Sequence, residues 1–223
     1  MSKTYYAIVL PFLAVVLVMQ SSLASAASAA RHQVSDFDSG RLAEWKEKSF
    51  VGKTDYQLVR LEGEQVLQAS SQASASGLYK KSSIDLKKFP FLNWRWRVEN
   101  RIESGDERKK SGDDYVARLY LVINHKYFFW KALALSYVWA NKSKKGEIWN
   151  NAFAGGSVKM FALRSAEDET GFWVSEKRNV YEDLKRAFGE EIYSIDAVAI
   201  MTDTDNSSSK ARAYYTDIFF SVD

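Results

Sequence analysis

Short runs of β-branched and aromatic residues recur along most of the chain, and clusters of Gly, Ser, Asp and Asn separate them. Runs of about four to eight such residues between turn signals are typical of strands, whereas helices need longer periodic runs. Many short strands favour a mostly β fold, a jelly-roll-like antiparallel β-sandwich with one or two short helices. The predicted strands are residues 56–61, 65–70, 77–81, 93–99, 114–124, 132–140, 157–163, 171–175, 194–202 and 213–222.

Local signals add one hairpin and one helix to this pattern. Residues 62–64 read Glu-Gly-Glu and predict a tight turn between the first two strands. A helix is predicted at Val180–Phe188, because Asn179 can cap its start and Gly189 can end it. A shorter helix around Arg41–Lys48 is an open alternative.

The start of the chain has the order of a secretory signal peptide. The basic residue Lys3 precedes an apolar stretch at residues 5–19, and small residues fill 21–30. This order predicts export, with cleavage after Ala26 or Ala29. A retained membrane anchor is the alternative, although the apolar stretch is shorter than the roughly 20 residues of a spanning helix.

Residues 1–29 are thus assigned to a cleaved signal peptide, and residues 30–223 to a single β-sandwich domain in the periplasm or the medium. The sequence contains no Cys, which excludes thiol nucleophiles and thiolate metal sites. Its formal net charge of +3 is spread among interleaved acidic and basic residues, so we expect no nucleic-acid partner. We also expect no membrane association after cleavage.

Two acidic turns mark the candidate site. Residues 112–114 read Gly-Asp-Asp and residues 202–206 read Thr-Asp-Thr-Asp-Asn, and each adjoins a strand rich in aromatic residues. If residues 114–124 are extended, alternation places Asp114, Arg118 and Tyr120 on one face. Carboxylates accept hydrogen bonds from hydroxyl groups, and flat rings cover apolar ligand faces, so this arrangement indicates a site for a polar ligand.

Structural roles remain open beside these ligand roles. The same-face pair Tyr137 and Trp139 either fills the core of the sandwich or forms a stacking surface for sugars. Arg118 either forms a structural ion pair with Asp114 or contacts the ligand. Arg178 precedes the predicted helix, and for this residue too a structural role and a ligand contact both remain open.

The sequence offers few catalytic groups. His125 is the one histidine within the predicted fold, and neither a Gly-x-Ser-x-Gly elbow nor a set of zinc ligands accompanies it. Calcium is kept as an alternative at Asp203 and Asp205, but Ser208 and Tyr214 stand where an EF-hand loop needs glycine and glutamate. No other cofactor is expected. Catalysis would depend on paired carboxylates, with candidates Asp113, Asp114, Asp203, Asp205, Glu176 and Asp183.

Several motifs together resemble an uncharacterised family of secreted bacterial proteins, a domain of unknown function. The resemblance implies a jelly-roll-like β-sandwich of lectin-like or galactose-binding-like character, and it implies no established activity. Two charged segments, Asn100–Lys110 and Asn141–Trp149, look specific to this chain. The motifs are Phe50-x-Gly-x-Thr-x-Tyr56, Ala75-Ser-Gly-Leu78, Trp94-Arg-Trp-Arg97, Gly112-Asp-Asp-Tyr-x-Ala-Arg-Leu-Tyr120, Tyr137-x-Trp139, Arg178-Asn-Val-x-x-Asp183, Phe188-Gly189 and Met201-Thr-Asp-Thr-Asp-Asn206.

The leading hypothesis is a module that binds a carbohydrate or another polyhydroxylated ligand, with a glycan or a cell-envelope component as partner. A carboxylate-dependent glycan hydrolase or lyase is the first alternative, and a structural envelope protein without a small ligand is the second. The predicted ligand-binding residues are Asp113, Asp114, Arg118, Tyr120, Tyr137, Trp139, Arg178, Asp203, Asp205 and Asn206.

Overall fold

The structure is a computed structural model that describes residues 31–103, 105–124 and 132–223. The predicted signal peptide and His125 lie outside the described residues. Residues His32–Asp223 form one compact unit. Within the described residues, no helix is both long and apolar enough to cross a membrane.

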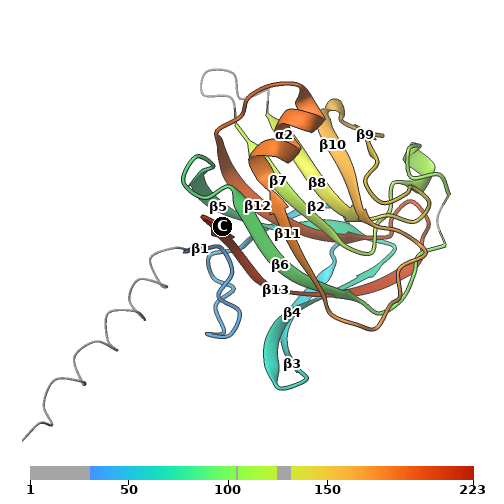
Figure 1. Cartoon of the computed structure of the whole chain (residues 1–223). Helices are drawn as coiled ribbons and strands as arrows, with labels where there is room; N and C mark the ends of the chain where they lie inside the picture. The colour runs from blue at the N-terminus through green and yellow to red at the C-terminus, as the bar shows by residue number, and fades with distance from the viewer. Residues whose placement is uncertain (1–30, 104, 125–131) are drawn as a thin grey trace, which may run out of the picture. The chain divides into compact units, whose positions relative to one another are not determined.

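The described strands form two sheets that pack face to face across one core (Figure 1). The seven-stranded sheet has the order β2 (Lys46–Val51), β5 (Ala75–Asp85), β12 (Ser194–Asp203), β7 (Arg118–Ile123), β8 (Leu133–Trp139), β10 (Gly155–Arg164) and β9 (Ile148–Asn151). The six-stranded sheet has the order β11 (Val174–Asn179), β6 (Phe91–Val98), β13 (Lys210–Ser221), β4 (Glu64–Gln72) and β3 (Asp55–Leu61), with β1 (Arg31–Gln33) beside β13.

Most strand pairs with a defined register are antiparallel, and β8 and β10 are parallel. The predicted mostly β sandwich is therefore confirmed. A short 3₁₀ turn, η1 (Lys110–Gly112), precedes β7.

Alternation along the strands builds the core. In β6, Leu92, Trp94, Trp96 and Val98 are buried, while the residues between them are half-buried on the outer face. Successive side chains of a strand point to opposite faces, so these four buried side chains all lie on the face of β6 that packs against the other sheet. Trp94 packs against Tyr137 of the opposite sheet, with ring centroids 5.3 Å apart. The core is thus rich in aromatic rings.

Helix α2 (Val180–Phe188) has the predicted bounds. The Asn179 side chain accepts a hydrogen bond from the backbone N–H of Glu182 at 3.2 Å. Gly189 adopts a left-handed conformation with φ of 74° and donates its N–H to the Lys185 carbonyl. Both ends of the helix are therefore satisfied locally, which is why the sequence signals were sufficient.

Two other local predictions had different outcomes. The turn between β3 and β4 has φ of 52° at Glu62 and 89° at Gly63, as a two-residue type I′ hairpin requires, and is confirmed. The helix around Arg41–Lys48 is wrong, because Lys46–Val51 forms strand β2 beside β5. Every residue of β2 is exposed, so backbone pairing with β5 rather than side-chain burial holds it as a strand.

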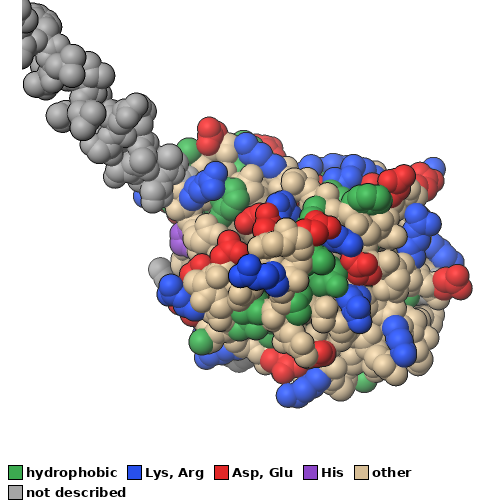
Figure 2. Space-filling model, turned by 90° about the horizontal axis from the view of Figure 1, so that it is seen from below, with side chains coloured by type: hydrophobic (Ala, Val, Ile, Leu, Met, Phe, Trp, Pro, Cys, Tyr) green, Lys and Arg blue, Asp and Glu red, His purple; other side chains and the backbone are tan. Residues whose placement is uncertain are grey.

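Charged side chains of both signs are interspersed over the face seen in Figure 2. On the outer face of the six-stranded sheet, Arg97 contacts Glu62 and Glu99 at 2.7 Å each. Pairing of this kind leaves no broad region of one sign on that face.

Candidate functional site

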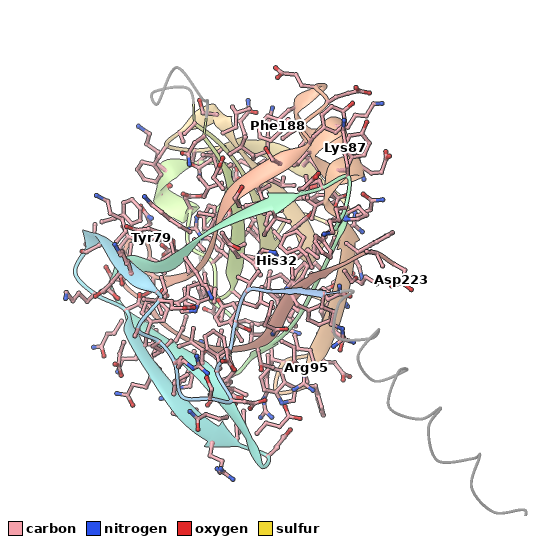
Figure 3. All side chains as sticks on the ribbon, turned by 90° about the vertical axis from the view of Figure 1, so that its left-hand side faces the viewer. His32, Tyr79, Lys87, Arg95, Phe188 and Asp223 are labelled. Carbon is pink, nitrogen blue, oxygen red and sulfur yellow. The ribbon has the colours of Figure 1, made fainter. Side chains whose placement is uncertain are left out.

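A groove of about 530 Å³ runs over the outer face of the seven-stranded sheet. Its floor includes Gly77, which has no side chain, and Ala199, whose side chain is a single methyl group, so the floor lies close to the backbone of the sheet. Ala199 pairs with Tyr79 of β5 on one side and with Tyr120 of β7 on the other. Both tyrosines are half-buried and line the groove, and Tyr79 lies beside β2 (Figure 3). Two rings therefore flank a shallow centre.

Two exposed phenylalanines stand at the ends of the groove. Phe50 lies on β2, one edge strand of the sheet, and is 65% exposed. Phe153 lies in the turn between β9, the other edge strand, and β10, and is 57% exposed. Large apolar side chains left in water beside a cavity are typical of a binding surface.

The two acidic turns meet along one wall of the groove. Asp114 is buried, and its carboxylate accepts the backbone N–H of Asn206 at 3.1 Å and of Ser207 at 2.6 Å. It thereby fastens the second acidic turn to the first. Asp113, Asp205 and Asn206 line the groove itself. The two acidic turns therefore lie together in the fold, and the Asp114 carboxylate links them.

Arg118 lies behind this wall in a buried ion pair with Asp203. Its Nε donates to Asp203 Oδ1 at 2.8 Å, and its Nη2 donates to Asp203 Oδ2. Nη1 donates to the Tyr120 hydroxyl at 2.9 Å, and the guanidinium lies 4.1 Å from the Tyr115 ring centroid. Burial opposes the charge of Arg118, but Asp203, Tyr120, Asp113 and Tyr115 together outweigh burial and hold the pKa of Arg118 well above its usual range.

The hypothesis that Arg118 pairs with Asp114 is wrong. Strand β7 begins at Arg118 rather than at Asp114, so alternation does not extend back to Asp114. Arg118 pairs with Met201 of β12, and Asp203 follows two residues later on the same face. Such diagonal neighbours on adjacent strands are within reach of a long side chain.

Asp113 and Asp205 are carboxylates of the groove wall in different settings. Asn151 donates its side-chain amide to both oxygens of Asp113 at 3.2 and 3.1 Å, which fixes the orientation of that carboxylate. Burial raises the pKa of Asp113, although Arg118 and Asn151 oppose this. Asp205 is half-buried and accepts a hydrogen bond of 3.3 Å from Asn206.

Replacing Asp205 with asparagine is expected to stabilise the protein increasingly as the pH rises. Burial, and then the nearby Asp114 carboxylate, raises the pKa of Asp205. Because this pKa is higher in the folded than in the unfolded state, ionisation of Asp205 costs stability as the pH rises from the unfolded towards the folded pKa. Asparagine cannot ionise and avoids that cost.

Melting temperatures of the wild type and of Asp205→Asn, measured from acidic to mildly alkaline pH, test this prediction. Asp38→Asn, a change at an exposed carboxylate outside the groove, is the control. A difference between wild type and Asp205→Asn that is constant across the pH range would contradict the prediction.

The oxygens of Asp114, Asp203 and Asp205 come within 4.8 Å of one another, as in a cation site. However, both oxygens of Asp203 accept from Arg118, and both oxygens of Asp114 accept backbone or amide N–H groups of the second turn. Calcium needs six to eight oxygen ligands with available lone pairs. The donors already present use the oxygens that calcium would need, so these residues do not fit the ion.

Three of the predicted ligand-binding residues lie away from the groove. Tyr137 and Trp139 are buried in the core between the sheets, where they pack against Trp94 and Trp96. A ring enclosed on both sides by the core cannot present a face to a ligand, so their predicted role as stacking surfaces is wrong. Their core-filling role is confirmed.

Arg178 is the third, and it joins β11 to α2. It donates to Asp183 at 2.8 and 2.5 Å, and Asp183 also accepts the Tyr137 hydroxyl at 2.7 Å. Glu176, another catalytic candidate, accepts hydrogen bonds from Arg164 and from the Trp96 ring N–H. Asp183 thus links α2 to β11 and β8, and Glu176 links β11 to β10 and β6, so both carboxylates have structural contacts.

The family of the chain follows from the comparison of its sequence with known families. Residues 43–219, more than half of the chain, match the family described as "Protein of unknown function (DUF3047)". The chain belongs to this family. The resemblance to a domain of unknown function is thereby confirmed for DUF3047, and no curated protein matches the sequence.

The solved structures similar to this DUF3047 chain include carbohydrate-binding modules. A family 11 carbohydrate-binding module from Clostridium thermocellum, in complex with a mixed-linked tetrasaccharide, has a TM-score of 0.46 and 9% identity, over 86% of this chain and 95% of the module. A family 30 carbohydrate-binding module of a Clostridium thermocellum cellulase has a TM-score of 0.46 and 10% identity, over 80% and 91%. Similarity at this level indicates neither a common ligand nor a common activity.

Sequence reasoning missed Phe50, Tyr79 and Phe153 as groove residues of this DUF3047 protein. Phe50 opens one of the motifs that carry the family resemblance, and Phe153 is a large apolar residue two positions before Gly155-Gly156. An aromatic residue inside a turn has no core to fill, and that was the available signal. Tyr79 carried no such signal, since aromatic residues are common in strands.

Proposed function

We propose that this DUF3047 protein binds a carbohydrate, or a ligand with a similar density of hydroxyl groups, in the groove of the seven-stranded sheet. The single observation that carries the proposal is that exposed aromatic rings and hydrogen-bond acceptors line the same groove. Phe50 and Phe153 supply the exposed rings, and Asp113 and Asp205 supply acceptors along the wall.

Sugars match this combination because a pyranose ring has apolar C–H faces and a polar edge of hydroxyl groups. The faces can pack on aromatic rings, and the hydroxyls can donate to carboxylates, which accept several hydrogen bonds. Asn151 already orients Asp113, so little side-chain freedom is lost when a ligand binds. A purely apolar ligand would desolvate these carboxylates without giving them a partner.

The sequence of residues 1–29 bears on where the protein acts. Their signal-like order supports action in the periplasm or in the medium, on a glycan found there. Sequencing the amino terminus of the exported protein tests the predicted cleavage after Ala26 or Ala29, and an intact Met1 would contradict it.

Glycan hydrolysis is the second candidate, because two carboxylates, Asp113 and Asp205, line the groove and both have raised pKa values. A general acid near neutral pH needs such a raised pKa. Chromatography of each bound oligosaccharide after incubation distinguishes binding from cleavage. Cleavage that persists in Asp113→Asn and Asp205→Asn would exclude these carboxylates as its catalysts.

Replacing Phe50 or Phe153 with alanine is expected to weaken glycan binding several-fold, because each ring contributes about 0.5–1.5 kcal/mol as a stacking partner. The melting temperature should stay near that of the wild type, since both rings are mostly in water. Binding is first found on a glycan array and then measured by calorimetry.

Phe172→Ala is the matched control, because Phe172 is 63% exposed and is not part of the groove lining. It should bind like the wild type. If Phe50→Ala, Phe153→Ala and Phe172→Ala all bind glycan as tightly as the wild type, the proposed site is refuted. It is also refuted if the wild type binds no glycan on the array.

A further inference from the structure

Aromatic side chains follow one another across the strands of the groove. In the order of the sheet they are Phe50 on β2, Tyr79 on β5, Tyr120 on β7 and Phe153 in the β9–β10 turn. Neighbouring strands lie about 4.8 Å apart, so the part of the groove that runs from β2 to β7 spans roughly 14 Å. Phe153 is two residues from Asn151, which contacts Asp113 beside Arg118 of β7, so about this distance separates Phe153 from Phe50. It exceeds the width of one sugar ring, so a single sugar cannot contact both phenylalanines.

Among the strands that the structure describes, none closes either end of this line. Strand β2 is the edge of the sheet, and each of its residues is exposed. At the other end, Phe153 is 57% exposed. A chain lying across the strands can therefore continue past both ends, which a pocket for a chain terminus would prevent.

The charges along the groove favour an uncharged ligand. Asp113 and Asp205 lie along its wall, and the positive charge of Arg118 is already paired with Asp203 and lies 3.8 Å from Asp113, so three carboxylates face one guanidinium there. Lys48 lies at the β2 end. A chain with a carboxylate on each unit would place negative charges beside Asp113 and Asp205, and like charges in a partly desolvated site repel.

We infer that the groove binds an internal stretch of an extended, uncharged glycan chain that lies across the strands from Phe50 to Phe153. The inference rests on the proposed function and deepens it. It assigns to Phe50 and Phe153 separate subsites for distant units of the same chain, and it assigns to Asp113 and Asp205 the exclusion of anionic chains.

Calorimetry with oligosaccharides of increasing length tests the inference. The ligands are neutral gluco-, manno- and xylo-oligosaccharides of two to six units, with oligogalacturonides of the same lengths as anionic comparators. Within the neutral series that binds, we expect the hexamer to bind at least tenfold more tightly than the dimer, and the oligogalacturonides to bind more weakly than neutral chains of equal length.

The two phenylalanines separate the subsites. Phe50→Ala and Phe153→Ala should each weaken binding of the hexamer, and the double variant should lose roughly the product of the two factors, because distant sites act independently. Binding of the dimer should respond to at most one of the two changes. Phe172→Ala again serves as the control.

The outcomes separate this inference from the proposed function. Equal affinity for dimer and hexamer would overturn the extended chain and leave carbohydrate binding intact. Tighter binding of oligogalacturonides than of neutral chains would overturn the role assigned to Asp113 and Asp205. If no oligosaccharide of any length binds, the proposed function itself fails.

Discussion

Replacing Arg118 with alanine is expected to lower the free energy of unfolding by about 3–5 kcal/mol, the usual effect of removing one partner of a buried ion pair. Arg118 is 2% exposed and Asp203 is 1% exposed, so the alanine variant leaves a carboxylate without its guanidinium in the interior. The Tyr120 hydroxyl also loses its donor. Urea denaturation of the two proteins, followed by circular dichroism, measures the difference.

Two further variants separate loss of the ion pair from loss of packing. Arg118→Lys keeps the positive charge but not the two-pronged contact with Asp203, so its stability should fall between those of the wild type and the alanine variant. Arg118→Leu combined with Asp203→Leu removes both charges and should be more stable than Arg118→Ala. A loss below about 1 kcal/mol in Arg118→Ala would show that water reaches the pair, and Arg118 would then be available to a ligand.

The Ala199→Phe variant is expected to weaken glycan binding by at least about 100-fold, which corresponds to roughly 2.7 kcal/mol. Ala199 lies on the floor of the groove between Tyr79 and Tyr120, and its side chain points away from the core. A phenyl ring at this position fills the space that the ligand needs. The core is untouched, so the melting temperature should change little.

Gln68→Phe is the matched control for this steric block. Gln68 is half-buried on the outer face of the six-stranded sheet, where it pairs with Gln57 and Tyr214. It receives the same ring on a sheet without the groove, and its binding should match that of the wild type. Unchanged binding by Ala199→Phe would show that the ligand lies elsewhere on the protein.

Features that depend on neighbouring residues were predictable from the sequence. The helix at Val180–Phe188 was predicted with its bounds because the side chain of Asn179 and the backbone of Gly189 satisfy its ends within a few residues. The same holds for the Glu62-Gly63 turn and for the buried and outer faces of β6. The fold class followed from the sum of these local patterns.

Features that depend on distant residues were not predictable in the same way. Arg118 and Asp203 are 85 residues apart, and the register between β7 and β12 decides that they meet. Tyr115 precedes β7 and packs with Val138 and Met160 in a second cluster outside the main core, a contact that only the folded chain creates. The groove is a still longer-range feature, since β2, β5 and the β9–β10 turn come together only in the folded sheet.

The aromatic core also determines which structural changes intrinsic tryptophan fluorescence can detect. Trp94, Trp96 and Trp139 are enclosed between the sheets, whereas the described lining of the groove contains phenylalanine and tyrosine but no tryptophan. The fluorescence of these three tryptophans therefore follows the opening of the sandwich rather than the occupancy of the groove. A tryptophan placed at Phe153 would give the groove an optical signal of its own.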